Sequence, residues 1–292
     1  MSLFCQLFGY TKQAYHKQRH HQDDTRLRER VVLDHVLAIR RQLPRAGVRK
    51  LHYLIQPSLE VKGIGYGRDK LFALLGREGL LVKKRKRYTK TTNSQHWMRK
   101  YPNLIKDRVP SRPEEIWVAD ITYVPGEHGH QYLHLITDAY SKQVMGYELS
   151  QDLEANSTLK ALKMAIRHRK YQPGPLIHHS DRGLQYCSSL YTEMLKDNGI
   201  GISMTENGDP YENPVAERMN GILKDEFGID LVKGDLKTNR QFTGQTIKIY
   251  NSLRPHLSCS MLTPVQMDAQ DVLEVKTWRR GKEKASSNRV IT

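Results

Sequence analysis

Cysteine is scarce in the 292-residue chain. Only Cys5, Cys187 and Cys259 occur, and no two of them form a CxxC pair. This spacing argues against a disulfide framework and against a zinc finger. The sequence also lacks an apolar run of the roughly 20 residues that span a bilayer, and its start lacks the charged segment and cleavage site of a signal peptide. We therefore expect a protein of the cell interior with no membrane partner.

Acidic residues are scarce in the first 110 residues, which hold 8 of the 31 Asp and Glu but 25 of the 47 Lys and Arg. The net charge is therefore +17 over this stretch and −1 over the remainder. A basic part joined to a neutral part is typical of proteins that bind a polyanion, most often nucleic acid. A basic surface that serves only solubility is the alternative.

The densest basic run, KKRKRYTK, places six positive charges in eight residues. It predicts contacts with backbone phosphates, although a solvated basic linker would have the same composition. The candidate DNA-binding residues of this run are Lys83, Lys84, Arg85, Lys86 and Arg87.

The basic part is expected to be all-helical. Within residues 2–22 we expect two short helices, separated by a turn at Gly9 and Tyr10, with Thr11 as a helix cap. Apolar residues at helical spacing predict a further helix over 24–42, which Pro44 would end. These elements would form an N-terminal helical region over residues 1–45.

A second pair of helices is expected at 47–61 and 64–81, with three glycines crowding the turn between them. The pair predicts a helix-turn-helix-like basic DNA-binding region over residues 46–90, followed by a proline-containing linker over 91–111. The side chains expected to be buried in the second helix are Leu71, Phe72, Leu74 and Leu75.

The pattern changes at Ile116, where three β-rich runs, at 116–124, 130–140 and 142–150, predict an antiparallel meander. Helical and strand patterns alternate after it. This order indicates an α/β layer with a mixed sheet flanked by helices, over a core of residues 112–272. A basic tail, 273–292, would follow.

Three acids of this core occupy positions that suit a metal. Asp120 lies in a strand, on the same face as Val118 and Thr122. Asp181 follows a predicted strand, and Glu217 lies early in a helix. Singly, each has a structural explanation: a salt bridge, a turn aspartate, and a glutamate at a helix N-terminus.

Together the three carboxylates predict a site for a hard divalent cation. Magnesium takes oxygen ligands, and two metal ions can activate the attacking oxygen and stabilise the leaving one in phosphoryl transfer. On the helix of Glu217, spacing places Asn213, Asn220 and Lys224 on one polar stripe.

Exactly 35 residues separate Asp181 from Glu217, which matches the D,D(35)E pattern of retroviral integrases and many bacterial transposases. Five further stretches, running in order, resemble the catalytic subunit of insertion-sequence transposases that is encoded as the second of two overlapping reading frames. The resemblance covers about residues 47–267. The stretches are WVADITYV, LITDAYSKQVMGYELS, HHSDRGLQY, ISMTENGDPYENPVAERMNGILKDE and YNSLRPH.

The resemblance implies a ribonuclease H-like core with Mg²⁺ or Mn²⁺, two ions per active site, held by Asp120, Asp181 and Glu217. It implies a DNA transposase that cleaves at element ends and transfers strands by 3′-hydroxyl attack. Lys224 would contact DNA near the scissile phosphate, and Asn213 would lie beside the site. Asp138 matches no metal ligand of the family and is interpreted as structural.

The implied partners are double-stranded DNA, further copies of the chain assembled on it, and a companion protein from the first reading frame. That companion would supply the family's separate recognition helix and leucine zipper, and the location would be cytoplasmic, at the nucleoid. The zinc-binding His/Cys domain of retroviral integrases is absent from this sequence. The YNSLRPH motif, residues 250–256, fits the family but has no assigned role.

Two other functions share the same core. An inactive or domesticated DNA-binding protein would keep the core as a scaffold. A ribonuclease H-like enzyme would cleave RNA–DNA hybrids, although the helical basic arm would then have no use.

Overall fold

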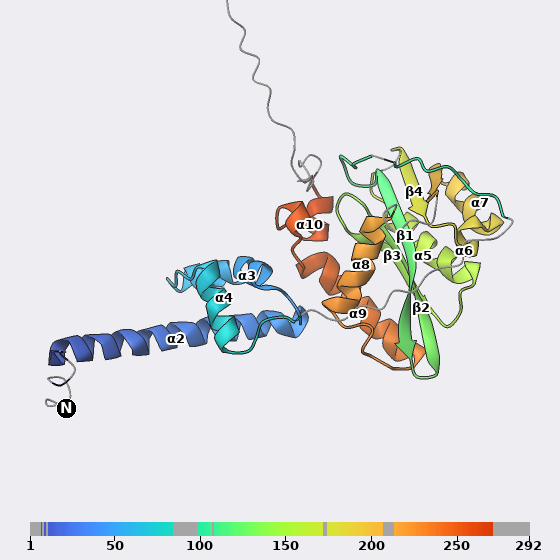
Figure 1. Ribbon diagram of the computed structural model, residues 1–292. Helices are drawn as coiled ribbons and strands as arrows, with labels where there is room; N and C mark the ends of the chain where they lie inside the picture. Colours follow the sequence, from blue (N-terminus) through green and yellow to red (C-terminus); the bar gives the residue numbers. More distant parts are fainter. Residues whose placement is uncertain are drawn as a thin grey trace, which may run out of the picture.

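The computed structural model describes Leu7, Gly9 and residues 11–83, 98–106, 108–171, 174–206 and 213–270 (Figure 1). The basic residues Lys84, Arg85, Lys86 and Arg87, much of the expected linker and the basic tail lie outside the described residues. Within the described part of the chain, no helix is both long and apolar enough to cross a membrane.

The N-terminal region contains one long helix, α2 (Lys12–Gln42), where the sequence predicted a break between two helices near residue 23. The Thr11 hydroxyl caps it by accepting a hydrogen bond from the Ala14 backbone N–H at 3.1 Å, as expected. The predicted break is wrong because residues 20–25 contain neither proline nor glycine, and nothing there interrupts the backbone ladder. The first of the two short helices falls mostly outside the described residues.

Two shorter helices, α3 (Val48–Val61) and α4 (Arg68–Arg77), occupy the two predicted ranges, although α4 is shorter than the predicted 64–81. Their buried side chains share one apolar cluster with those of α2. Gly63 takes a left-handed backbone, with φ of 66°, in the turn between them. Leu71, Leu74 and Leu75 are buried, but Phe72 is 56% exposed, so its predicted burial is wrong. Phe72 lies about 100° around the helix from Leu71, outside the stripe that faces the core.

The core contains a five-stranded mixed sheet in the order β3-β2-β1-β4-β5. β1, β2 and β3 form the predicted antiparallel meander, whereas β4 and β5 run parallel to β1. This confirms the predicted α/β class and its ribonuclease H-like mixed sheet. The strands are β1 (Ile116–Gly126), β2 (Gly129–Asp138), β3 (Val144–Ser150), β4 (Leu176–Ser180) and β5 (Ile200–Met204).

Helices cover both faces of this sheet. Trp117, Ala119 and Ile136 point into the cluster that also contains side chains of α5 (Ala155–His168), α6 (Leu184–Cys187) and α7 (Ser189–Asp197). Leu133 and Leu135 point the other way, towards α8 (Pro214–Asp225) and α9 (Leu236–Leu253). Figure 1 shows α8 crossing the sheet over β1. The last helix among the described residues is α10 (Pro264–Asp268).

Close packing of α5 on the sheet depends on Gly146 in β3. A Cβ atom at this position would lie 2.1 Å from the Ala161 carbonyl oxygen of α5. A larger residue would therefore push the helix off the sheet.

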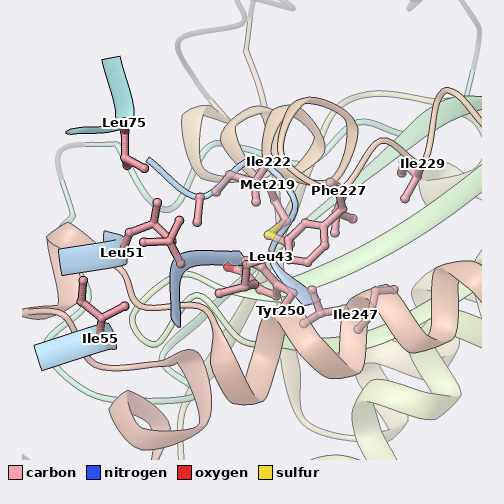
Figure 2. Close-up of a cluster of buried hydrophobic side chains, with 14 of the residues drawn as sticks. Leu43, Leu51, Ile55, Leu75, Met219, Ile222, Phe227, Ile229, Ile247 and Tyr250 are labelled. Atoms are coloured by element: carbon pink, nitrogen blue, oxygen red, sulfur yellow. The ribbon is translucent and has the colours of Figure 1, made fainter. Parts of the chain in front are cut away.

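One apolar cluster joins the helical region to the core (Figure 2). It runs from Leu43 and Leu51 of the N-terminal region to Ile222 of α8 and Tyr250 of α9. An ion pair adds to this junction, with the Lys50 ammonium 3.0 Å from the Glu226 carboxylate.

Candidate active site

The pairing of two parallel strands brings Asp120 and Asp181 to the same edge of the sheet. Val118 of β1 pairs with His179 of β4, and the two aspartates lie two residues further along their chains. Asp120 is held within β1, while Asp181 follows the last residue of β4. Both acids therefore lie at the level where β4 ends, the position at which α/β sheets bind ligands.

Helix α8 brings Glu217 to these aspartates. Pro214 begins the helix, and Glu217 lies in its first turn. Two amide side chains fasten the helix to β1: Asn213 donates to the Ala119 carbonyl oxygen at 3.0 Å, and Asn220 donates to Asp120 Oδ2 at 2.6 Å. These two bonds fix the position of α8 on either side of Glu217.

The carboxylate of Asp120 lies in the electric field of the other two acids. Burial, followed by the charge of Asp181 and then that of Glu217, raises the pKa of Asp120 to about 7. The Ile121 N–H, 2.9 Å from Asp120 Oδ1, and the charge of Lys224 act in the opposite direction. The anionic form of Asp120 is thus poorly compensated by the protein alone.

The donor set fits a hard divalent cation in its chemistry, because all three acids offer oxygen ligands and their mutual repulsion would be relieved by positive charge. Across the residues that the structure describes, however, no three His, Cys, Asp or Glu side chains are grouped closely enough to hold a metal ion as placed. The fold therefore brings the acids to one place without forming a closed coordination shell.

Lys224 lies two turns beyond Glu217 on α8 and is half-buried. Burial lowers the pKa of Lys224, while the charges of Asp230, Asp120 and Asp225 raise it. Lys224 is therefore within electrostatic range of Asp120, although the charge of Asp230 acts on it more strongly. Asn213, in contrast, is buried and uses its amide N–H on β1.

Of the basic run, the structure describes only Lys83, which is exposed and whose carbonyl oxygen accepts a hydrogen bond from Arg45. The candidates Lys84, Arg85, Lys86 and Arg87 lie outside the described residues.

Asp138 has a structural setting, in agreement with its interpretation from the sequence. Its carboxylate accepts hydrogen bonds from the Glu114 N–H at 2.8 Å, the Tyr140 N–H at 3.1 Å and the Ser141 N–H at 2.6 Å. It thereby holds the turn after β2 and takes no part in the site.

The YNSLRPH motif, which had no assigned role, fastens α9 to its neighbours. Tyr250 donates to the Lys142 carbonyl oxygen at 2.7 Å, and Asn251 forms two 3.0 Å bonds with the backbone of Val144. The Arg254 guanidinium donates hydrogen bonds to both carboxylate oxygens of Glu226, at 2.6 and 2.8 Å, and to His256 at 2.7 Å. The i, i+4 spacing of Tyr250 and Arg254 was the only sequence signal for this role.

Asn220 is the residue that sequence reasoning left without a function. Its place on the polar stripe of Glu217 was visible, but its bond to Asp120 spans 100 positions. Only the packing of α8 on β1 reveals it.

Known proteins resemble this chain over both the core and the preceding helices. Residues 110–210 match a family described as integrase core domain, and residues 198–264 match a second family of that description. An uncharacterized 31 kDa protein of insertion element IS600 from Shigella sonnei is 36% identical over 225 residues, 76% of this chain and 81% of that protein. The transposase InsF for insertion sequence IS3A from Escherichia coli K12 is 30% identical over 220 residues, 73% of this chain and 75% of the transposase.

Among solved structures, the HTLV-2 integrase catalytic core domain in complex with magnesium aligns with a TM-score of 0.42 and 22% identity. The alignment covers 54% of this chain and 97% of that domain.

Proposed function

The chain belongs to the insertion-sequence transposases with an integrase core domain, and we propose that it cleaves DNA at element ends and transfers the freed strand into new DNA. The observation that best supports this chemistry is the placement of three carboxylates: the register of β1 on β4 brings Asp120 level with Asp181, and the bonds from Asn213 and Asn220 hold the helix of Glu217 against β1. Such a cluster of carboxylates suits divalent metal ions and phosphate substrates.

The proposed reaction consists of two displacements at phosphorus. In the first, water attacks a phosphodiester at the element end, the bond from phosphorus to O3′ breaks, and a 3′-hydroxyl and a 5′-phosphate remain. In the second, that 3′-hydroxyl attacks a target phosphodiester, and the target strand leaves with its own 3′-hydroxyl. The second step forms one phosphodiester bond for each one that it breaks, so no energy-rich cofactor is needed.

Asp120, Asp181 and Glu217 would hold Mg²⁺ or Mn²⁺, two ions per site. Bound metal would activate the attacking oxygen and neutralise charge on the leaving one. Asn220 keeps one oxygen of Asp120 in place and so orients the carboxylate. Asn213 keeps the start of α8, and with it Glu217, against β1.

Lys224 would contact a phosphate near the scissile bond, since it lies two turns along α8 from Glu217 and interacts electrostatically with Asp120. Lys83, Lys84, Arg85, Lys86 and Arg87 would neutralise phosphates further along the duplex. Assembly of several copies on DNA, a companion protein from the first reading frame, and a place at the nucleoid belong to the same proposal.

Conservative substitution of the three acids tests the chemistry. Asp120→Asn, Asp181→Asn and Glu217→Gln remove a metal ligand with little change of shape, and each should lower cleavage of end-containing DNA by roughly 10³-fold or more. DNA affinity, measured in EDTA, should remain close to that of the wild type. Asp197→Asn, on the exposed end of α7, is the matched control and should cleave normally.

Near-normal cleavage by any of the three variants would reject the assignment. An inactive wild type that binds DNA but takes up no Mg²⁺ in a calorimetric titration would instead identify a DNA-binding scaffold. Preference for RNA–DNA hybrids over duplex DNA would identify a ribonuclease H-like enzyme.

A further inference from the structure

A cavity with both apolar and cationic lining lies beside α8, and none of the three acids lines it. Its volume is about 450 Å³, and its wall is built by α3, β2 and the turn after it, α8, and the end of α9. Four cationic side chains line it, and no Asp or Glu is among the described residues that do so. The cations are Lys50, Lys142, Arg218 and Arg254.

The charges around this cavity do not balance. Glu226, which lies behind the wall, pairs with Lys50 at 3.0 Å and with Arg254 at 2.6 Å. Lys142 donates to the Ala139 carbonyl oxygen, and Arg218 has no hydrogen bond or ion pair with any residue that the structure describes. Glu226 thus pairs with two of the four cations, and the charge of Asp138 acts on Lys142.

The titration of the neighbouring groups agrees with this excess. Burial, followed by the charge of Arg254, lowers the pKa of Lys50 to about 8 despite the nearby Glu226. Burial also lowers the pKa of His256 far below its ordinary value, and all four cations contribute. All four positive charges therefore act on His256, and among them Arg218 is exposed to solvent.

We propose that this cavity binds one phosphate group of a DNA strand, with Arg218 and Lys142 as its direct ligands. A guanidinium fork and an ammonium are the side chains that match phosphate oxygens, and the hydroxyls of Thr137 and Ser258 line the same cavity. The proposal rests on the proposed action on DNA. It adds a contact that the three acids do not provide.

The position of the cavity indicates what a phosphate bound there would do. Arg218 follows Glu217 directly on α8, so a phosphate bound there would lie on the same helix turn as one acid of the candidate site, although on another face of it. Lys50 reaches the cavity from the helical region, and Arg254 from the core. A phosphate in this place would therefore hold DNA at the junction of the two regions.

Inorganic phosphate is the first probe, used with the full chain in a phosphate-free buffer that contains EDTA. Calorimetry should show binding to the wild type, and Arg218→Gln and Lys142→Gln should each weaken it at least tenfold. The matched control is Lys163→Gln on α5, across the sheet, which removes an exposed cation and should leave phosphate binding unchanged.

The salt dependence of duplex DNA binding is the second probe. A side chain that neutralises one phosphate contributes about 0.9 to the slope of log affinity against log salt concentration. Arg218→Gln and Lys142→Gln should each lower the slope by about one such step, and the double variant should lower it no further, because both side chains serve the same phosphate. Lys163→Gln should not change the slope.

Two kinds of DNA phosphate could fill the cavity, and duplexes with and without 5′-phosphates distinguish them. Equal losses on both duplexes assign an internal phosphodiester, and losses only with 5′-phosphates assign a strand end. The proposal is overturned if phosphate binding is absent in the wild type, or if the two single variants have additive slopes, as separate surface cations would. Failure of the wild type to bind DNA at all would reject the proposed function, while the inorganic phosphate titration would still decide whether the cavity binds phosphate.

Discussion

The N-terminal helices and the core differ in whether their charged residues are exposed or buried. Among the described residues, the charged residues that are buried as a whole, His aside, all belong to the core: Glu114, Asp138, Arg254 and Asp268. In α2, α3 and α4, buried positions hold only apolar residues. Charges in water bind a polyanion over a distance at low cost, whereas chemistry requires charges held in place and partly desolvated. Under the proposed function, the exposed charges of the helical region would serve DNA binding, and the desolvated charges of the core would serve chemistry and the positioning of DNA beside it.

Glu226 permits the sharpest test of this difference, because it binds one cation from each region. Arg254 has a side chain that is 3% exposed and contacts both carboxylate oxygens. Arg254→Met should lower the free energy of unfolding by about 3–5 kcal/mol, since it leaves a carboxylate without its principal partner. Lys50→Met should change the free energy of unfolding by about 1 kcal/mol or less, because repulsion from Arg254 offsets the attraction of Glu226.

Urea unfolding of the two variants in phosphate-free buffer measures both effects. Equal losses would show that the helical region depends on buried charge as much as the core does. A larger loss for Lys50→Met would reverse the comparison.

The second largest effect, on the rate of cleavage, is expected for Asn220, whose side-chain amide orients Asp120. Asn220→Ala removes the 2.6 Å bond to Asp120 and should lower the rate of cleavage about 10–100-fold. Raising the Mg²⁺ concentration should restore part of the rate, because the ligand itself remains. The control is Asn198→Ala, whose amide bonds to the Met194 carbonyl oxygen at an exposed helix end. A rate loss that no Mg²⁺ concentration relieves would mean that Asn220 acts on folding.

The smallest effect is expected for substitutions in the basic N-terminal part of the chain, where DNA affinity is measured. Lys83→Gln combined with Lys84→Gln should weaken DNA binding only a few-fold. The slope of log affinity against log salt concentration should fall by the contribution of about two phosphates. The loss should be similar for all DNA sequences, as measured by fluorescence anisotropy. Lys160→Gln combined with Lys163→Gln, on the exposed face of α5, is the control. A loss confined to one DNA sequence would contradict binding by phosphate contacts.

The sequence by itself predicted most of the elements and the three acids of the candidate site. Period-two alternation gave the meander and placed Asp120 inside a strand, and helical spacing gave α3, α4 and α8. These features depend on neighbours a few residues apart, which a single sequence displays. The sequence prediction was wrong about the break in α2 and about the burial of Phe72, because the local pattern at both places was compatible with more than one structure.

Tertiary structure alone decided how the site is put together. The register of β1 on β4 brought Asp120 level with Asp181, and the packing of α8 joined Asn220 to Asp120. It also gathered four cations from both regions around one cavity. Pairings between positions tens to hundreds of residues apart leave no local period in the sequence, because they arise only when the sheet and helices pack. The acids found from their spacing are therefore sequence information, and their surroundings are a property of the fold.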